Sequence, residues 1–381
     1  MSFSFPFCPN RSCTLHYPPF PTDSRWYIPW GRYFTLAFGE VPRFRCLHCG
    51  KTFSSQTFSL DYYSKRVLNY RLVERMVSES MSIAGIGRWF GVNEKVVRNK
   101  VGRLSRQALG SHGRLWKQLR VTEDLVADGI ETWCRSQYHP GHLNVVVGKD
   151  SQMVYWQDYV GLKRKGKMRE EQKRRREEVE RKWPSDPQGL EKSFECLGEE
   201  VDRWMEEGGK RPVVFYTDEH PAYVRGLAQV VGLERRKAQG EFEHKRLSSQ
   251  LPRTRSNPLF SVNYIDREIR KDQANYVRET TRAARNVNDM MQRLSIYRVV
   301  HNYRKAYRLR PDQREDRVHG EVAGIPRSLL REELSKSYYT KRRFLTHLVL
   351  TADSWKIWTR MCERPSFREG KSVYIPRFIL D

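Results

Sequence analysis

Residues 211–223 read Arg-Pro-Val-Val-Phe-Tyr-Thr-Asp-Glu-His-Pro-Ala-Tyr, and this stretch decides the predicted fold. Its apolar run from Val213 to Tyr216 is typical of a buried strand, and Pro221 marks the start of a helix. Asp218 follows the strand almost directly. In an open α/β sheet, a residue at the carboxyl end of a strand faces the crevice where ligands bind. The stretch therefore predicts a mixed α/β fold with Asp218 at the functional edge of its sheet.

A second acidic residue follows the same pattern upstream. Within Leu125–Trp133, we expect an apolar strand that ends at Asp128. Two further strands are predicted at Leu143–Gly148 and Met153–Trp156, and an amphipathic helix at residues 188–206. Three strands, a helical region, and a strand ending in an acid form the element order of a ribonuclease H-like core. We assign that core to residues 120–310.

The third acidic residue is expected at the start of a long helical stretch, residues 262–308. Both Asp266 and Glu268 are available there, and two residues apart on a helix means about 200° apart, so only one can face the other acids. Three carboxylates suit a pair of Mg²⁺ or Mn²⁺ ions. We therefore predict magnesium or manganese ligands at Asp128, Asp218 and Asp266, with Glu268 as the alternate third acid.

Four of the seven cysteines lie in the first 49 residues, as the pairs Cys8/Cys13 and Cys46/Cys49. Two close pairs of thiols are the ligand set of a structural tetrahedral Zn²⁺ site. The first pair has a longer spacing than usual, so His16 is an alternative to Cys13. We predict a zinc ribbon at residues 1–60.

Residues 64–115 have helical periodicity and carry a turn at residues 91–93, with Asn93 as a plausible N-cap. A short helix, a turn and a basic second helix favour a helix-turn-helix. An ordinary helical hairpin is the alternative. The DNA-binding residues expected on the second helix are Lys95, Arg98, Lys100 and Arg103.

The remaining segments are predicted from composition. Residues 163–182 hold eleven Lys or Arg and five Glu, which indicates a charged helix inside an insertion at about residues 160–206. Residues 105–120 are expected to form a linker or a further helix. Residues 311–381 are expected to form a C-terminal extension of mixed short elements.

Charge and hydropathy restrict the partners. The chain has 381 residues, 70 Lys and Arg against 45 Asp and Glu, and a formal charge of +25, which favours a polyanion such as DNA. No window of 18 uninterrupted apolar residues is present, and no secretory signal is recognised, so we expect neither a membrane span nor secretion.

At this point the sequence resembles insertion-sequence transposases of the zinc-ribbon, helix-turn-helix, DDE type. The resemblance covers residues 8–303 in patches and is carried by residues 43–54, by Tyr216-Thr217-Asp218 with Ala222-Tyr223, and by residues 262–267. Two departures stand out: Asp266 replaces a Glu, and Gly129 follows Asp128 where the family usually has Glu.

The resemblance implies a metal-dependent DNA transposase. Such an enzyme binds double-stranded DNA at the terminal inverted repeats of its mobile element, cuts it with Mg²⁺ and transfers the strand to target DNA. It also implies self-association in a synaptic complex and a cytoplasmic, nucleoid-associated location. The alternatives are a decayed zinc-ribbon DNA-binding regulator that does not cut, and a zinc-ribbon nuclease of repair or RNA processing.

Overall fold

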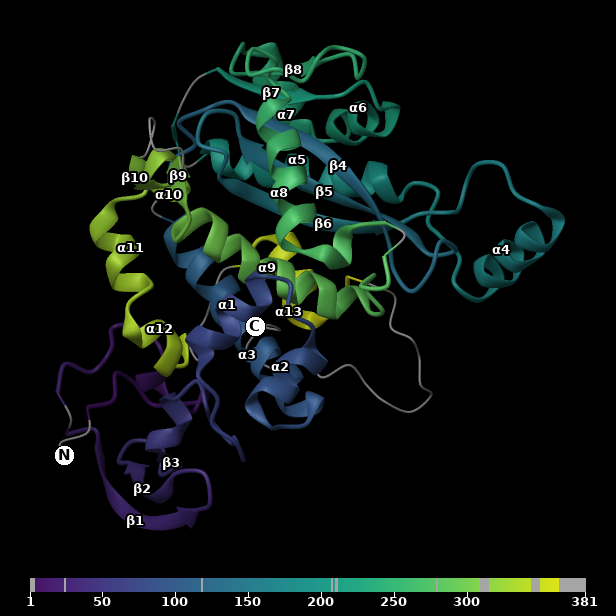
Figure 1. Ribbon diagram of the computed structural model, residues 1–381. Helices are drawn as coiled ribbons and strands as arrows, with labels where there is room; N and C mark the ends of the chain where they lie inside the picture. The colour runs from purple at the N-terminus through teal and green to yellow at the C-terminus, as the bar shows by residue number, and fades with distance from the viewer. Residues whose placement is uncertain are drawn as a thin grey trace.

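The structure is a computed structural model that describes residues 4–23, 25–117, 119–206, 208–209, 212–278, 280–308, 315–343 and 350–362. A small N-terminal sheet lies at one end of a larger α/β body, and one helix projects from the opposite end (Figure 1). None of the described helices is long and apolar enough to cross a membrane. The mixed α/β class predicted from the sequence is confirmed.

The central sheet of the body has five strands in the order β6-β5-β4-β7-β8. Their bounds are Leu125–Trp133 (β4), Pro140–Gly148 (β5), Val154–Gly161 (β6), Val213–Thr217 (β7) and Phe242–Arg246 (β8). In this sheet, β5 pairs antiparallel with both β4 and β6, whereas β7 pairs parallel with both β4 and β8. The parallel pairs align the carboxyl ends of β7 and β8 along one edge of the sheet.

Two groups of helices cover the two faces of this sheet. The first group is α5 (Gly189–Glu206), α6 (Pro221–Ala228) and α7 (Val231–Ala238), and the second is α8 (Phe260–Asp272) and α9 (Val287–Tyr303). The predicted helix at 188–206 is confirmed as α5. Phe194, Leu197 and Val201 of α5 are fully buried in the main core. The apolar face of α5 therefore forms a layer of the body.

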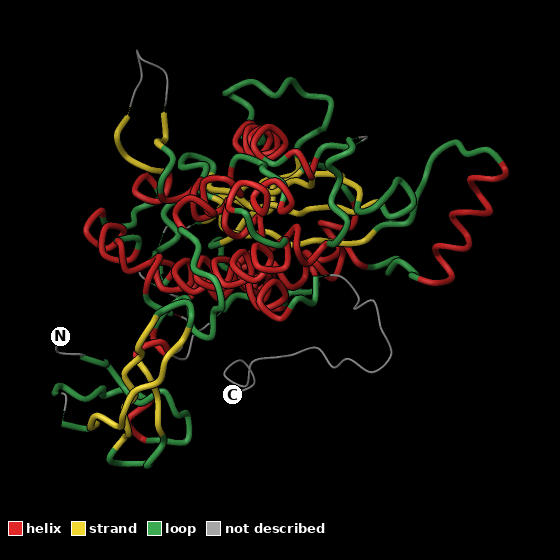
Figure 2. The backbone as a smooth tube through the Cα atoms, turned by 60° about the horizontal axis from the view of Figure 1, so that its bottom comes forward, coloured by secondary structure: helices red, strands yellow, loops and turns green. Residues whose placement is uncertain are grey.

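Helix α4 (Glu170–Lys182) and the loops on either side of it form a separate segment. It projects away from the body in two views (Figures 1 and 2). Val179 is its one buried residue, so few apolar contacts hold the helix to the body. The two ends of the segment meet, because a Cβ on Gly189 would lie 2.7 Å from Cγ1 of Val160. We call residues 162–188 the arm.

Helices α1 (Tyr70–Ser78), α2 (Ile83–Phe90) and α3 (Glu94–Trp116) precede the sheet. Asn93 caps α3 by accepting a hydrogen bond from the Lys95 amide, as predicted. No linker follows at residues 105–116, because α3 runs on as one helix and packs along α9. Buried contacts such as Ser105–Ser295 and His112–Tyr303 join the two helices. Among the described residues, the buried apolar side chains from Leu60 to Trp358 that line these helices and the central sheet therefore form one hydrophobic core.

The long helical stretch expected at 262–308 is broken in the structure. Helix α8 ends at Asp272, a short 3₁₀ turn (η3) spans Ala274–Tyr276, and α9 begins after the N-cap Asn286. The break has a tertiary cause, because the Gln273 side chain leaves the helix to donate to the carbonyl oxygens of Val77 and Ser78.

The described C-terminal elements are short, as predicted: β9 (Ala306–Arg308), β10 (Glu315–Val318), α10 (His319–Val322), α11 (Arg327–Glu333), α12 (Lys336–Thr340) and α13 (Ala352–Thr359). Helix α13 is tied to α9 by a fully buried ion pair between Asp353 and Arg298. Residues 363–381 of the expected extension lie outside the described residues.

The N-terminal sheet has three antiparallel strands, β1 (Tyr27–Thr35), β2 (Gly39–Cys46) and β3 (Thr52–Ser54), with the 3₁₀ turns η1 (Thr14–His16) and η2 (Ser55–Phe58). Its aromatic core, which includes Phe5, Trp26, Phe44 and Phe53, is separate from the core of the body. So small a core buries little apolar surface, and folds of this size usually need a metal or disulfides.

Candidate functional site

Strand register brings two of the predicted acids side by side. Leu125 pairs with Phe215 and Val126 with Tyr216 across the parallel strands β4 and β7. Extending this register by two residues places Asp128 level with Asp218. The pairing of the two strands ends before these residues, but Asp218 stays close enough for its charge to act on Asp128.

Asp128 does not end its strand, which corrects the sequence prediction. Strand β4 continues to Trp133, because β5 pairs with it along its whole length. Only the pairing with β7 stops before Asp128. Asp218 does lie just beyond the end of β7, and its Oδ1 accepts a hydrogen bond of 2.9 Å from the amide of His220.

Helix α8 contributes the third acid from across the sheet. It packs on β4 and β5, and the Asp266 carboxyl interacts electrostatically with that of Asp128. Glu268 points elsewhere. It is buried against Lys305 and Lys271, with 2.9 Å between Lys271 Nζ and its Oε1. The structure thus places Asp266, and not the alternate Glu268, beside Asp128.

Asp128 and Asp266 occupy an environment that disfavours their charged forms. Burial raises the pKa of Asp128 to about 6, and the neighbouring charge of Asp218 acts in the same direction. Burial also raises the pKa of Asp266 well above its ordinary value, with Asp128 contributing. The Oδ1 atom of Asp266 is buried without a hydrogen-bond partner. Carboxylates arranged in this way repel one another until a cation binds between them.

This donor set fits hard divalent cations. It supplies carboxylate oxygens from three separate elements, which is the chemistry that Mg²⁺ and Mn²⁺ prefer. The oxygen atoms of the three carboxylates do not all lie within 4.8 Å of one another. Among the described residues, only the four N-terminal cysteines form a group of three or more potential ligands that close together.

The glycine after Asp128 has a packing explanation. Side chains alternate along a strand, so position 129 faces away from Asp266 and toward α6. There the His142 ring lies against the Gly129 backbone, and a Cβ at position 129 would overlap it. The ring also stacks on Tyr223 of α6, and burial lowers the pKa of His142 to about 4. Gly129 therefore cannot be exchanged for the larger Glu while His142 remains.

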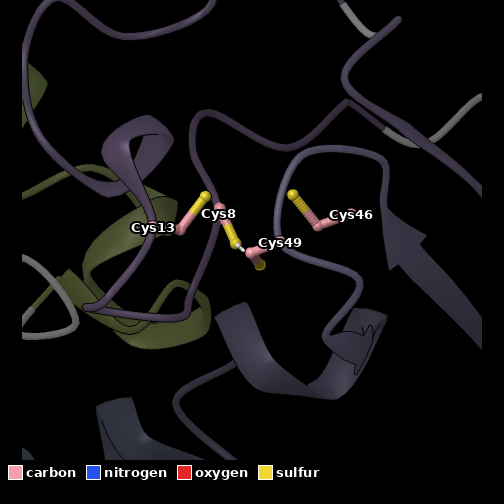
Figure 3. A group of neighbouring side chains, drawn as sticks. All are labelled: Cys8, Cys13, Cys46 and Cys49. Atoms are coloured by element: carbon pink, nitrogen blue, oxygen red, sulfur yellow. Dashed lines mark hydrogen bonds between the residues drawn. The ribbon is translucent and has the colours of Figure 1, made fainter.

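The four N-terminal cysteines converge in a second candidate site. The Sγ atoms of Cys8, Cys13, Cys46 and Cys49 all lie within 4.8 Å of one another, and Figure 3 shows the four side chains gathered from two separate segments of the chain. His16 does not replace Cys13. Its Nδ1 lies 2.7 Å from the Cys8 carbonyl oxygen, outside the cluster, where it steadies the turn that carries Cys8. The cluster could hold a metal such as zinc with four protein ligands.

The surroundings of the thiols are uneven. Burial raises the pKa of the Cys8 thiol. Burial alone would also raise the pKa of Cys49, but hydrogen bonds from the Asn10 side chain and the Lys51 amide bring it to about 7. Burial in apolar surroundings disfavours a thiolate unless a cation lies beside it. A bound metal would supply that cation and would allow the four sulfur atoms to act as thiolate ligands.

Two of the four predicted DNA-binding residues on α3 face the protein interior. Lys100 is buried, forms an ion pair with Asp61 and donates to Ser64 Oγ. Arg103 donates to the Leu60 carbonyl oxygen and stacks over Tyr62. These two predictions are corrected, because both residues link α3 to the loop that precedes α1. Lys95 is exposed, and half-exposed Arg98 pairs with Asp289.

One residue near the acids was missed by the sequence analysis. Arg253 lies in the loop before α8, and its charge acts on both Asp128 and Asp266. The only signal in the sequence was an arginine-containing loop, residues 248–258, that leads into the third acid.

Comparison with known proteins assigns no family to the chain: no protein-family model matches it, and no curated protein matches it in sequence.

Proposed function

We propose that this protein is the transposase of an insertion sequence, a metal-dependent enzyme that cuts DNA and transfers the cut strand. One observation carries the proposal: Asp128 of β4 interacts electrostatically both with Asp218, just after the end of β7, and with Asp266 of α8. The strand order β6-β5-β4-β7-β8, with β5 antiparallel to its neighbours, supports a ribonuclease H-like core.

In this proposal the three aspartates hold Mg²⁺ or Mn²⁺. When bound, these ions neutralise charge on the phosphodiester and lower the pKa of water. The protein positions the DNA strand so that water attacks phosphorus in line with the leaving oxygen. The new P–O bond forms as the bond to the 3′ oxygen breaks, and that oxygen takes up a proton. The freed 3′ hydroxyl then attacks a target phosphorus and releases the target 3′ oxygen.

The same proposal assigns the remaining parts to DNA binding. The four-cysteine sheet would be a zinc ribbon, and α2, the turn at Gly91–Asn93 and α3 would be a helix-turn-helix. Lys95 is the exposed basic residue at the start of α3, where recognition helices contact DNA. Burial of Lys100 and the intramolecular contacts of Arg103 limit the direct contacts to the first turns of that helix.

The arm supplies a further basic surface beside the acids. At its root, Arg164 lies 4.8 Å above the Tyr138 ring, and the charge of Lys165 acts on His220, two residues after Asp218. Residues 163–182 carry a net charge of +6, eleven Lys and Arg minus five Glu. A projecting basic helix of this kind can follow the phosphates of a duplex that enters the site.

The decisive experiment compares Asp218→Asn with wild type on a plasmid that carries the inverted repeats of the element. In Mg²⁺ or Mn²⁺, wild type should cut and join strands, whereas the variant should bind the same DNA without cutting. Glu219→Gln is the matched control, because Glu219 is the exposed neighbour of Asp218. Cleavage by Asp218→Asn would refute the assignment. Binding without cleavage by wild type would instead indicate the regulator.

A further inference from the structure

Arg253 is held in a structured loop between β8 and α8. The Asn257 side chain donates to the Pro252 carbonyl oxygen at 3.0 Å and accepts from the Leu259 amide at 2.9 Å. These bonds close the turn that contains Arg253 and join it to the start of α8. Arg253 is partly buried, whereas Arg255, two residues later, is exposed. The loop therefore directs one of its two arginines inward.

Two buried atoms of opposite charge lack partners in this region. Nη1 of Arg253 and Oδ1 of Asp266 are both buried without a hydrogen bond. The two side chains are close enough for the charge of Arg253 to act on Asp266 and Asp128. Yet no ion pair of 4.0 Å or less joins Arg253 to any of the three described aspartates. If Arg253 served only to neutralise the carboxylates, we would expect a direct ion pair.

The two unpartnered atoms, Nη1 of Arg253 and Oδ1 of Asp266, indicate which kind of ligand could contact both side chains. The guanidinium needs an anionic oxygen, and the carboxylate needs a cation. A phosphodiester whose oxygens contact a divalent ion supplies both at once. A rigid guanidinium fork also matches phosphate oxygens, on which charge is concentrated during phosphoryl transfer.

We propose that Arg253 binds a non-bridging oxygen of the scissile phosphodiester, opposite the three aspartates. This inference rests on the proposed function and names a phosphate-binding residue for it. Arg253 would touch the group that reacts and would add positive charge beside it. Its removal should lower phosphate binding without lowering metal binding.

The test measures phosphate binding separately from DNA cleavage. Full-length protein is loaded with Mn²⁺, and the ³¹P relaxation of inorganic phosphate reports phosphate held beside the paramagnetic ion. Mn²⁺ affinity is measured in parallel by electron paramagnetic resonance. The variants are Arg253→Ala, Arg253→Lys and the loop control Arg255→Ala, and plasmid cleavage is measured for each.

We expect Arg253→Ala to weaken phosphate binding at least 10-fold and to slow cleavage by about 10²–10³-fold, the usual loss of one charge-stabilising donor. Arg253→Lys should recover part of both, and Arg255→Ala should match wild type. Mn²⁺ affinity should stay the same or rise in Arg253→Ala, because a positive charge has left the site.

The outcomes separate this inference from the proposed function. Normal phosphate binding by Arg253→Ala overturns the inference, and so does a parallel loss of Mn²⁺, which would make Arg253 a support for the aspartates. Wild type that binds Mn²⁺ and phosphate through Arg253 but never cuts DNA supports the phosphate site and refutes the transposase. Wild type that binds neither refutes both.

Discussion

Two acidic residues only two positions apart on α8 have different environments. Asp266 lies near Asp128 with an unpartnered buried oxygen, whereas Glu268 pairs with Lys271 and Lys305. The lysines lower the pKa of Glu268 despite its burial, while burial raises that of Asp266. At the scale of single residues, the helix turn of about 100° per residue separates a candidate metal ligand from an ion-paired structural residue.

This difference gives a prediction with a built-in control. Asp266→Asn should abolish cleavage, because it removes a charge from the proposed metal site, and should leave the protein stable or more stable. Glu268→Gln should retain cleavage but lower the free energy of unfolding by about 1–3 kcal/mol, because Lys305 and Lys271 lose their partner. Plasmid cleavage and urea unfolding measure the two effects. The reverse pattern would make Glu268 the third acid.

The aspartates also predict a pH dependence of stability. The pKa of Asp128 is raised to about 6 from an ordinary 3.8, so the folded state holds its proton more tightly than the unfolded state. Stability from this group is therefore present at low pH and is lost as the pH rises from about 4 to about 6. With a shift of roughly two units, the loss is about 3 kcal/mol.

The measurement is the difference between wild type and Asp128→Asn in urea unfolding without added Mg²⁺ or Mn²⁺, from about pH 4 to pH 7.5. We expect the variant to gain stability relative to wild type as the pH rises, because only wild type acquires the repelling charge. Added Mn²⁺ should restore wild type at neutral pH. A difference that does not change with pH would contradict the raised pKa.

At the scale of elements, α4 and α5 show that neighbouring helices can belong to different parts of the molecule. Both were expected inside one insertion. Helix α5 buries Phe194, Leu197, Val201 and Trp204 in the core, whereas α4 buries only Val179. The arm is therefore the part that can be removed without opening the core, and its two ends already meet at Val160 and Gly189.

Replacing residues 163–186 by a short Gly/Ser linker should preserve the thermal stability of the body and weaken DNA binding. The arm carries net positive charge, and each phosphate contact contributes about −0.9 to the slope of log K against log salt. We expect that slope to become shallower by about 2–5 units, as measured by fluorescence anisotropy on a duplex. An unchanged slope together with unchanged affinity would make α4 a solvated helix without a role in DNA binding.

At the scale of the whole molecule, the chain forms two hydrophobic cores of unequal size. Residues 60–358 share one core, and the cysteine-bearing sheet has its own aromatic core. One backbone hydrogen bond that connects the two parts runs from the Arg342 amide to the Phe58 carbonyl oxygen. The four clustered cysteines lie in or against the small core and are absent from the large one among the described residues.

Metal removal should therefore unfold only one part. We expect purified protein to contain about one zinc per chain, and a chelator to remove hydrogen-exchange protection from residues 4–58 while residues 60–358 remain protected. Cys46→Ser should have the same effect without a chelator. Cys196→Ser, outside the cluster, should keep the zinc. Continued protection of residues 4–58 after metal loss would refute a structural zinc site.

The sequence by itself determined the local features of this protein. Apolar runs predicted β4, β5, β6 and β7, helix periodicity predicted α5, and Asn93 predicted the start of α3. Cysteine spacing predicted the four-thiol cluster. Each of these depends on interactions between residues close in the chain, or on a spacing that a tight turn enforces.

Only the tertiary structure decided which side chains face one another. Strand register set Asp128 beside Asp218, the phase of α8 selected Asp266 over Glu268, and packing against Asp61 buried Lys100. The loop that carries Arg253 is held by hydrogen bonds of the Asn257 side chain, and the hydrophobic periodicity of the sequence does not predict them. The physical reason is that burial and charge pairing depend on contacts between residues that are far apart in the sequence. A local sequence pattern does not show which distant residues will be in contact.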